Sequence, residues 1–138
     1  MTSDDYCIMA IAAADFQFVN SSLRRSNGIL IKDLMLANSF TIKGSKFFAS
    51  PKQHGEAMIQ LTDSPGEIVD CHFERKEEDQ VERRPRWTSR ERAVALHGGL
   101  SDVKIATTTF INLYHEAGGG AIHYKDAGDN QLINCTFS

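Results

Sequence analysis

The sequence predicts an all-β fold, a right-handed parallel β-helix (a solenoid) of about four to five coils. The first observation is a repeated phrase: an aliphatic residue, four further residues and then Phe. Its four copies run from Ile42 to Phe47, from Ile68 to Phe73, from Ile105 to Phe110 and from Leu132 to Phe137. The second observation is the period, because the four Phe residues lie 26, 37 and 27 residues apart. A charged insertion of about ten residues accounts for the longer interval, and a fixed period of roughly 20–50 residues is typical of repeat architectures.

The elements of each unit can be expected in order along the chain. A degenerate first copy covers residues 8–20, and a looser second copy begins at Ile29–Lys32 and ends at Phe47. The later copies carry a strand before the phrase, at residues 57–61, 93–97 and 121–124. Turns rich in Gly, Asp and Ser follow these strands, at residues 63–66, 98–102 and 126–130. We therefore expect each unit to be a strand, a tight turn, a second strand and a connection of variable length.

Stacked units of this kind bury their apolar side chains by placing like residues on top of one another. The Phe residues are predicted to form one internal stack, and the aliphatic residues a second. Small side chains two residues before each Phe are expected inside as well, because strand side chains alternate; they are Ser45, Cys71, Thr108 and Cys135. Cys71 and Cys135 would lie two coils apart, about 9.6 Å. A disulfide needs Cα atoms within roughly 7 Å, so both are predicted to be free, buried thiols.

Other folds explain the pattern less well. An antiparallel sandwich also has short strands and frequent Gly-containing turns, but it gives no reason for one residue class to return at one phase of the period. A helical bundle is disfavoured because Gly and Asn interrupt the candidate helices. The Ala-rich residues 11–14 are an exception, since they can form a short helix that caps the N-terminal end of the solenoid.

The chain is expected to be a single β-helix domain over residues 1–138, with a charged loop inserted at about residues 74–92. The last coil would expose strand edges and one end of an apolar stack. We therefore expect a protein partner or neighbouring β-helix coils at the C-terminal end, and the chain to be part of a longer rod or assembly.

Composition narrows the function only mildly. Apolar residues make up 41% of the chain and charged residues 24%, and the formal net charge is −3. This balance does not indicate a nucleic-acid partner. No apolar run approaches the roughly 18 residues of a membrane span. The first residues are acidic where a secretory signal peptide is basic, so the compartment stays open.

Residues 118–122 (Gly-Gly-Gly-Ala-Ile) and residues 134–137 (Asn-Cys-Thr-Phe) together resemble one repeat of the chlamydial polymorphic outer membrane proteins. That family pairs a Gly-Gly-Ala-Ile tetrapeptide with a downstream Phe-x-x-Asn, which is one residue short here at residues 18–20 and 110–112. Similar repeats occur across pectate-lyase-like β-helix proteins. The resemblance covers roughly residues 27–138 and implies a β-helix of the surface, adhesive or carbohydrate-handling kind, and hence an extracellular or cell-surface location.

The insertion holds the first candidate binding site. Its second half is basic and carries the only Trp of the chain; the candidates are Arg83, Arg84, Arg86 and Trp87. An aromatic ring flanked by guanidinium groups can stack on a sugar ring or pair with anionic groups. The alternatives are a self-neutralising solvated loop and a loop that contacts a protein partner.

Catalysis would need carboxylates or basic residues gathered on one outer face. The candidates are Asp70, His72 and Glu74, although the outward columns of the phrase are mixed and lack the signatures of polygalacturonases. Cys and His do not cluster at metal-ligand spacing, so no metal or cofactor is expected. The sequence therefore favours a non-catalytic structural, adhesive or ligand-presenting module with a polysaccharide as a candidate ligand. The alternative is a carbohydrate-active enzyme of the polysaccharide lyase or glycoside hydrolase kind.

Overall fold

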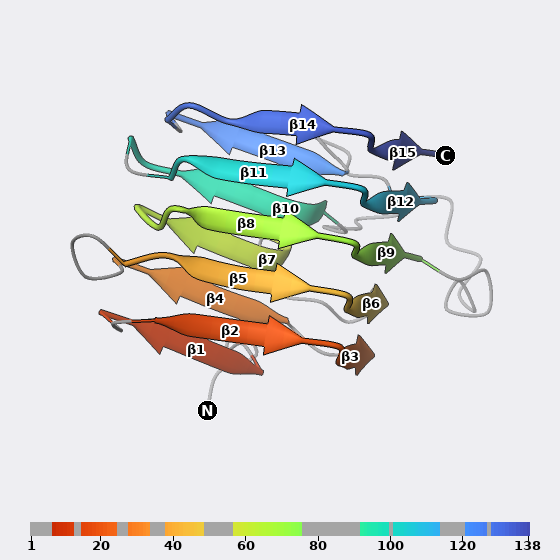
Figure 1. Cartoon of the computed structure of the whole chain (residues 1–138), viewed down its shortest axis with the longest axis horizontal. Helices are drawn as coiled ribbons and strands as arrows, with labels where there is room; N and C mark the ends of the chain where they lie inside the picture. The colour runs from red at the N-terminus through yellow and green to blue at the C-terminus, as the bar shows by residue number, and fades with distance from the viewer. Residues whose placement is uncertain are drawn as a thin grey trace, which may run out of the picture.

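The computed structural model describes residues 7–12, 15–24, 28–33, 38–48, 57–75, 92–99, 101–113, 121–126 and 128–138. These residues form a right-handed parallel β-helix of five stacked coils (Figure 1). All described neighbours pair in parallel, so each coil of the chain hydrogen-bonds to the next. The predicted fold class is confirmed, and the coil number falls at the upper end of the expected range.

Each coil contributes three short strands. Coil 1 holds β1 (Ile8–Ile11), β2 (Phe16–Val19) and β3 (Ser22–Arg24), and coil 2 holds β4 (Ile29–Lys32), β5 (Phe40–Lys43) and β6 (Lys46–Phe48). Coil 3 holds β7 (Ala57–Thr62), β8 (Gly66–Val69) and β9 (His72–Glu74), and coil 4 holds β10 (Arg92–His97), β11 (Val103–Ala106) and β12 (Thr109–Ile111). Coil 5 holds β13 (Ile122–Lys125), β14 (Gln131–Ile133) and β15 (Thr136–Phe137). The first, second and third strands of the coils form sheets A, B and C, each of five strands.

The expectation of two strands per unit was wrong, because the repeated phrase bends in its middle. One residue at this bend has a left-handed backbone in every coil: Asn20, Gly44, Asp70, Thr107 and Asn134, with φ between 50° and 61°. The bend turns the chain from sheet B into sheet C without interrupting the ladder, since Gly44 N–H donates to the Val69 carbonyl at 3.0 Å. The phrase therefore contains two short strands joined by a corner.

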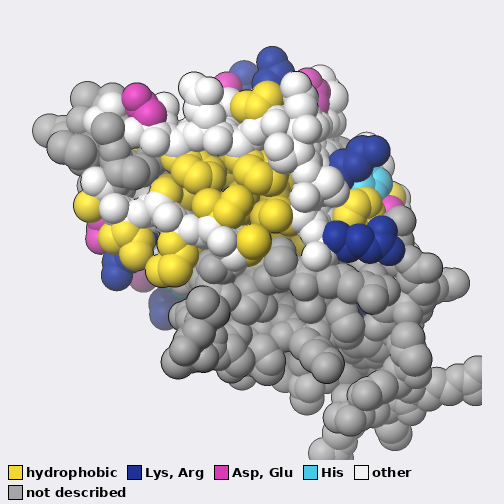
Figure 2. Space-filling model, turned by 90° about the horizontal axis from the view of Figure 1, so that it is seen from below, with side chains coloured by type: hydrophobic (Ala, Val, Ile, Leu, Met, Phe, Trp, Pro, Cys, Tyr) yellow, Lys and Arg dark blue, Asp and Glu magenta, His cyan; other side chains and the backbone are white. Residues whose placement is uncertain are grey.

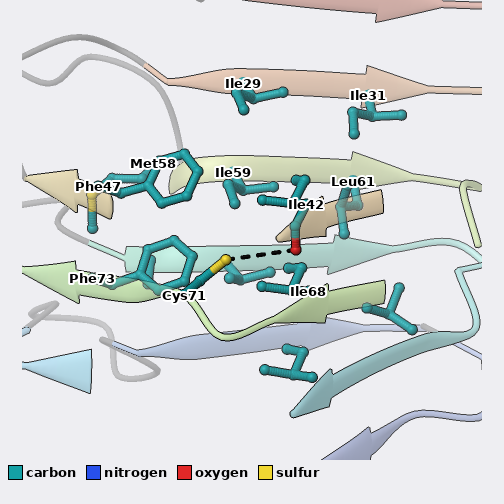
Figure 3. Close-up of a cluster of buried hydrophobic side chains, with 14 of the residues drawn as sticks. Ile29, Ile31, Ile42, Phe47, Met58, Ile59, Leu61, Ile68, Cys71 and Phe73 are labelled. Atoms are coloured by element: carbon teal, nitrogen blue, oxygen red, sulfur yellow. Dashed lines mark hydrogen bonds between the residues drawn. The ribbon is translucent and has the colours of Figure 1, made fainter. Parts of the chain in front are cut away.

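The predicted internal stacks are confirmed. The rings of Phe47 and Phe73 lie 4.8 Å apart between centroids, those of Phe73 and Phe110 5.2 Å apart, and those of Phe110 and Phe137 4.9 Å apart, all within 10° of parallel. A second column joins Ile42, Ile68, Ile105 and Leu132 through the registers of sheet B. Figure 3 shows part of this core between the sheets. The three parallel sheets enclose these apolar side chains and remove them from water. This burial is the main stabilising term of the fold.

The small column before each Phe also lies inside. Ser45, Cys71 and Thr108 are buried, and each satisfies its side chain on the carbonyl two residues earlier; the Thr108 hydroxyl donates to Ala106 at 2.9 Å. The Cys71 thiol additionally reaches the Ile42 carbonyl at 3.6 Å (Figure 3). All three cysteines are free, as predicted for Cys71 and Cys135, but the prediction that Cys135 is buried was wrong. Cys135 is only half-buried, because among the described coils coil 4 covers coil 5 from one side alone.

Coil 1 differs from the expected first copy. The expected copy ends at residue 20, whereas the coil continues through β3 to Arg24. Phe18 occupies the aliphatic column opposite Ile42, and Leu23 occupies the Phe column opposite Phe47. Coil 1 therefore carries the phrase with its aromatic and aliphatic residues exchanged. The helical cap is also wrong at its first residues, since Ile11 ends β1 and Ala12 has a φ of 53°.

Candidate functional site on the outer face of sheet C

The structure brings two of the three catalytic candidates together. His72 and Glu74 lie two residues apart in β9, so both point outward from sheet C. His72 Nε2 is 2.8 Å from Glu74 Oε1, and the side chains are 30% and 23% exposed. Asp70 instead stands at the exposed corner between sheets B and C, where its φ is 53°. Its carboxylate makes no hydrogen bond to His72 or Glu74 among those that the described residues form. The pair is a chemical unit, and Asp70 is separate from it.

Two neighbouring coils extend this pair into a larger cluster. The registers of sheet C place Phe48 beside Glu74, Lys46 beside His72, and Arg24 beside Phe48. The Phe48 ring centroid lies 6.1 Å from that of His72, and the Arg24 guanidinium carbon lies 5.3 Å from the Phe48 centroid. We call these residues the sheet C cluster: Arg24, Lys46, Phe48, His72 and Glu74. On coil 4, Thr109 and Ile111 continue its two rows.

The cluster combines four kinds of chemical group on one face: an aromatic ring, cations, an imidazole and a carboxylate. The guanidinium of Arg24 lies within cation–π distance of the Phe48 ring. With its proton on Nε2, the His72 imidazole donates to the Glu74 carboxylate, which holds both side chains in place. Lys46 is exposed beside them. The arrangement therefore offers an aromatic ring, two permanent cations and a carboxylate–imidazole pair across about 10 Å of three coils.

Sequence reasoning missed Arg24 and Phe48. Both stand one residue after a member of the Phe column, at the same outward position as Glu74. An alignment of the repeats by their Phe column would have identified Phe48. Arg24 follows Leu23 instead of a Phe, so it could be identified only by knowing that coil 1 extends to Arg24. The binding candidates Arg83, Arg84, Arg86 and Trp87 lie outside the described residues, and so they stay a prediction.

Two further side-chain groups occur elsewhere on the coils. Asp33 and Asp63 follow β4 and β7 directly, and both have a left-handed backbone. They occupy equivalent positions on adjacent coils, because the register of the two strands continues to them through the bond from Asp33 N–H to Thr62 O. His97 and His123 lie on adjacent strands of sheet A, with ring centroids 6.0 Å apart. Within the described ranges, no three His, Cys, Asp or Glu side chains are grouped so that they could hold a metal ion. These described ranges also contain no helix that is long and apolar enough to cross a membrane.

No protein-family model matches this chain, and neither the curated proteins nor the solved structures gave a match.

Proposed function

We propose that this protein is a non-catalytic β-helical module that presents the sheet C cluster to a ligand. The contact chain from Arg24 through Phe48 and His72 to Glu74 carries the proposal, because it joins three coils into one surface. Phe47 and Phe73 lie buried directly behind this face. A surface held by a packed core is rigid, and a rigid surface loses little conformational entropy on binding.

The side chains favour an acidic polysaccharide as the ligand. The half-buried Phe48 ring offers an apolar surface for the C–H face of a sugar. Arg24 and Lys46 can pair with carboxylate or sulfate groups, while Glu74 and His72 can exchange hydrogen bonds with hydroxyl groups. Because coils repeat at about 4.8 Å, the cluster suits a linear polymer better than a small compact molecule.

Calorimetric titration with an acidic oligosaccharide and its neutral counterpart tests this proposal. Phe48→Ala is expected to weaken binding of the acidic ligand about tenfold, the effect of about 1.4 kcal/mol, and Lys46→Gln to weaken it severalfold with a smaller salt dependence. Glu67→Gln is the matched control, since Glu67 lies in the same coil as Glu74 but on sheet B. Equal losses from Glu67→Gln and Glu74→Gln, or no binding at all, would count against the sheet C cluster.

A carbohydrate-active enzyme is the second candidate, and the 2.8 Å contact of His72 with Glu74 favours it. A carboxylate that accepts a hydrogen bond from a neighbouring imidazole and so orients it is a usual feature of general acid–base sites. In that case the protein would cleave an acidic polysaccharide, and His72→Gln would abolish the formation of cleavage products while leaving binding measurable. If the oligosaccharide is unchanged after prolonged incubation with the wild-type protein, the enzyme proposal is contradicted and only the ligand-presenting function remains.

We also infer that coil 5 is an association surface for a protein partner. Three of its inner-column residues are exposed, with Tyr124 at 42%, Leu132 at 48% and Phe137 at 53%. Exposed apolar side chains next to strand edges favour association. Light scattering of the purified 138-residue chain should show a mass that rises with concentration; a constant monomer mass would contradict this inference.

A further inference from the structure

We propose that coil 5 of one copy stacks on coil 1 of a second copy, head to tail, so that all three sheets continue across the junction. This inference rests on the proposed association surface of coil 5, and it names the partner and the register. It is independent of the ligand on the sheet C cluster. Three observations carry it: the periodic backbone hydrogen bonds, the match of the inner columns, and the match of the amide side chains.

The backbone bonds of the inner coils specify the bonds of the junction. At the corner column, the N–H of one coil donates to the next coil, as Gly44 does to Val69 and Thr107 to Ile133. At the first residue of each sheet C strand the direction is reversed, as His72 N–H donates to Ser45 and Thr136 N–H to Thr108. Continuing this pattern pairs the Asn134 N–H with the Val19 carbonyl of the second copy. It also pairs the Ser22 N–H of that copy with the Cys135 carbonyl. The two ends are complementary because they are opposite sides of one ladder.

The inner columns also match across the junction. The register of sheets B and C carries Leu132 onto Phe18 and Phe137 onto Leu23. In sheet A the large Tyr124 ring meets the small Ala10. Stacking would thus cover the side chains that coil 5 exposes.

The receiving face of coil 1 is apolar. Ile8, Phe16, Phe18 and Leu23 are half-buried and pack against the core. Figure 2 views the molecule from the coil 1 end and shows hydrophobic side chains gathered in the middle of this face. An apolar centre with a polar edge is the usual arrangement of a protein–protein contact.

The polar positions select a second copy over other partners. Asn20 and Asn134 are the two Asn residues of the corner column, and they occupy its first and last coils. Gln17 and Gln131 likewise occupy the first and last positions of one outward row in sheet B. Stacking places Asn on Asn and Gln on Gln, and such amide ladders stabilise stacked strands. Lys125 would face Ile11, and His123 would face Met9, so like charges do not oppose one another there.

A head-to-tail contact does not close on itself, so it extends to trimers and longer rods. A disulfide across the junction tests the register directly. Cys135 and Ser21 would be neighbours in the small column, about 4.8 Å apart, which is within the range of a disulfide. The variant Ser21→Cys is made together with Cys7→Ser, since Cys7 is exposed. Other coils place Cys in this column, so the variant should fold.

Oxidation of this variant with diamide should give a ladder of dimers, trimers and larger species on a non-reducing gel. Adding Cys135→Ser should remove the ladder. Dimers alone, formed through two Cys135 thiols and also in protein that retains Ser21, would indicate a symmetric contact. That outcome would overturn the head-to-tail register but leave coil 5 as an association surface. A constant monomer mass at all concentrations would refute both.

A pair of neighbouring substitutions gives a second test. Leu132→Lys places a charge at the inner column, and Ile133→Lys places it on the outer face; these residues are 48% and 41% exposed in the same strand. Leu132→Lys should weaken association at least tenfold, whereas Ile133→Lys should change it less than threefold. Equal effects would contradict stacking through the inner columns. Circular dichroism controls for folding in both variants.

Discussion

Gly66 shows how a single residue shapes the core of coil 3. It begins β8 at an inner position, opposite Phe40 of coil 2. A Cβ on Gly66 would lie 2.4 Å from both the Phe40 ring and the Phe40 carbonyl oxygen. The Phe40 ring is fully buried, so it occupies the volume that a side chain at position 66 would need. A large residue and a missing side chain thus complement each other between adjacent coils.

Gly66→Ala is therefore expected to destabilise the protein by about 1–3 kcal/mol, the usual cost of overpacking. The backbone oxygen of Phe40 cannot move away without disturbing the ladder between β5 and β8. Gly99→Ala is the control, because a Cβ there meets nothing within 4 Å. Urea unfolding monitored by circular dichroism measures both variants, and a loss below 0.5 kcal/mol for Gly66→Ala would be incompatible with this packing.

The buried thiol of Cys71 makes the stability of the folded protein depend on pH. Burial raises the pKa of its thiol, although backbone hydrogen bonds near Ser45 and Val69 act in the opposite direction. A raised pKa means that the folded protein holds the proton more tightly than the unfolded chain does. This stabilisation is complete below the ordinary thiol pKa of about 8.5 and is lost as the pH rises through the folded value.

The free energy of unfolding should therefore fall above about pH 8.5, and Cys71→Ser should make this decrease shallower. Serine is a fair replacement because Ser45 occupies the same column in coil 2. Cys7→Ser, which removes an exposed thiol, is the control for the substitution itself. Denaturant titrations from pH 7 to 10 give the three curves. Parallel curves for wild type and Cys71→Ser would show that this thiol does not contribute.

At the scale of the elements, the sequence reveals the columns but not the corner. Ile42 and Phe47 are five residues apart, an odd number, so a continuous strand would place them on opposite faces. Both are buried because the left-handed Gly44 resets the alternation. The corner is hard to predict because Gly, Asn, Asp and Thr all occupy it. The period and the residue class of the columns were enough for the fold.

The candidate site was predictable only within one strand. His72 and Glu74 share a face because they are two residues apart, which the sequence shows. Arg24 and Phe48 join them only through the register between coils. That register depends on connections of unequal length, and coil 1 also exchanges its aromatic and aliphatic residues. Because of this exchange, the sequence pattern did not show where coil 1 ends, and the position of Arg24 could not be predicted.

The Phe column is expected to contribute unequally along its length. Phe73 is fully buried between two parallel rings, whereas Phe137 is 53% exposed with one ring partner. Phe73→Ala should cost about 3–5 kcal/mol, as for other buried aromatic residues, and Phe137→Ala about 1 kcal/mol. Thermal or urea unfolding measures the difference. Similar costs at both positions would mean that Phe137 is covered in solution, as it would be in stacked copies.

At the scale of the whole molecule, stability should decrease from the centre to the ends. Each coil contacts only its neighbours, so the protein behaves as a one-dimensional array. The strands of coils 2, 3 and 4 pair on both sides, while those of coils 1 and 5 pair on one side. Opening an end coil breaks one interface, whereas opening coil 3 breaks two. The end coils are therefore the first to open in a single copy.

Amide hydrogen exchange can follow this gradient at one repeated position, the corner column. Gly44 N–H and Thr107 N–H make equivalent bonds of 3.0 and 2.9 Å, to Val69 and Ile133. In dilute solution the Thr107 amide should exchange faster, because its acceptor lies in coil 5. The Asn134 amide should be the fastest of the three. At high concentration it should become protected, because stacking would supply the Val19 carbonyl of a second copy. In the Leu132→Lys variant the Asn134 amide should stay unprotected at every concentration. If its protection changes neither with concentration nor with this substitution, the junction is not the cause of the protection.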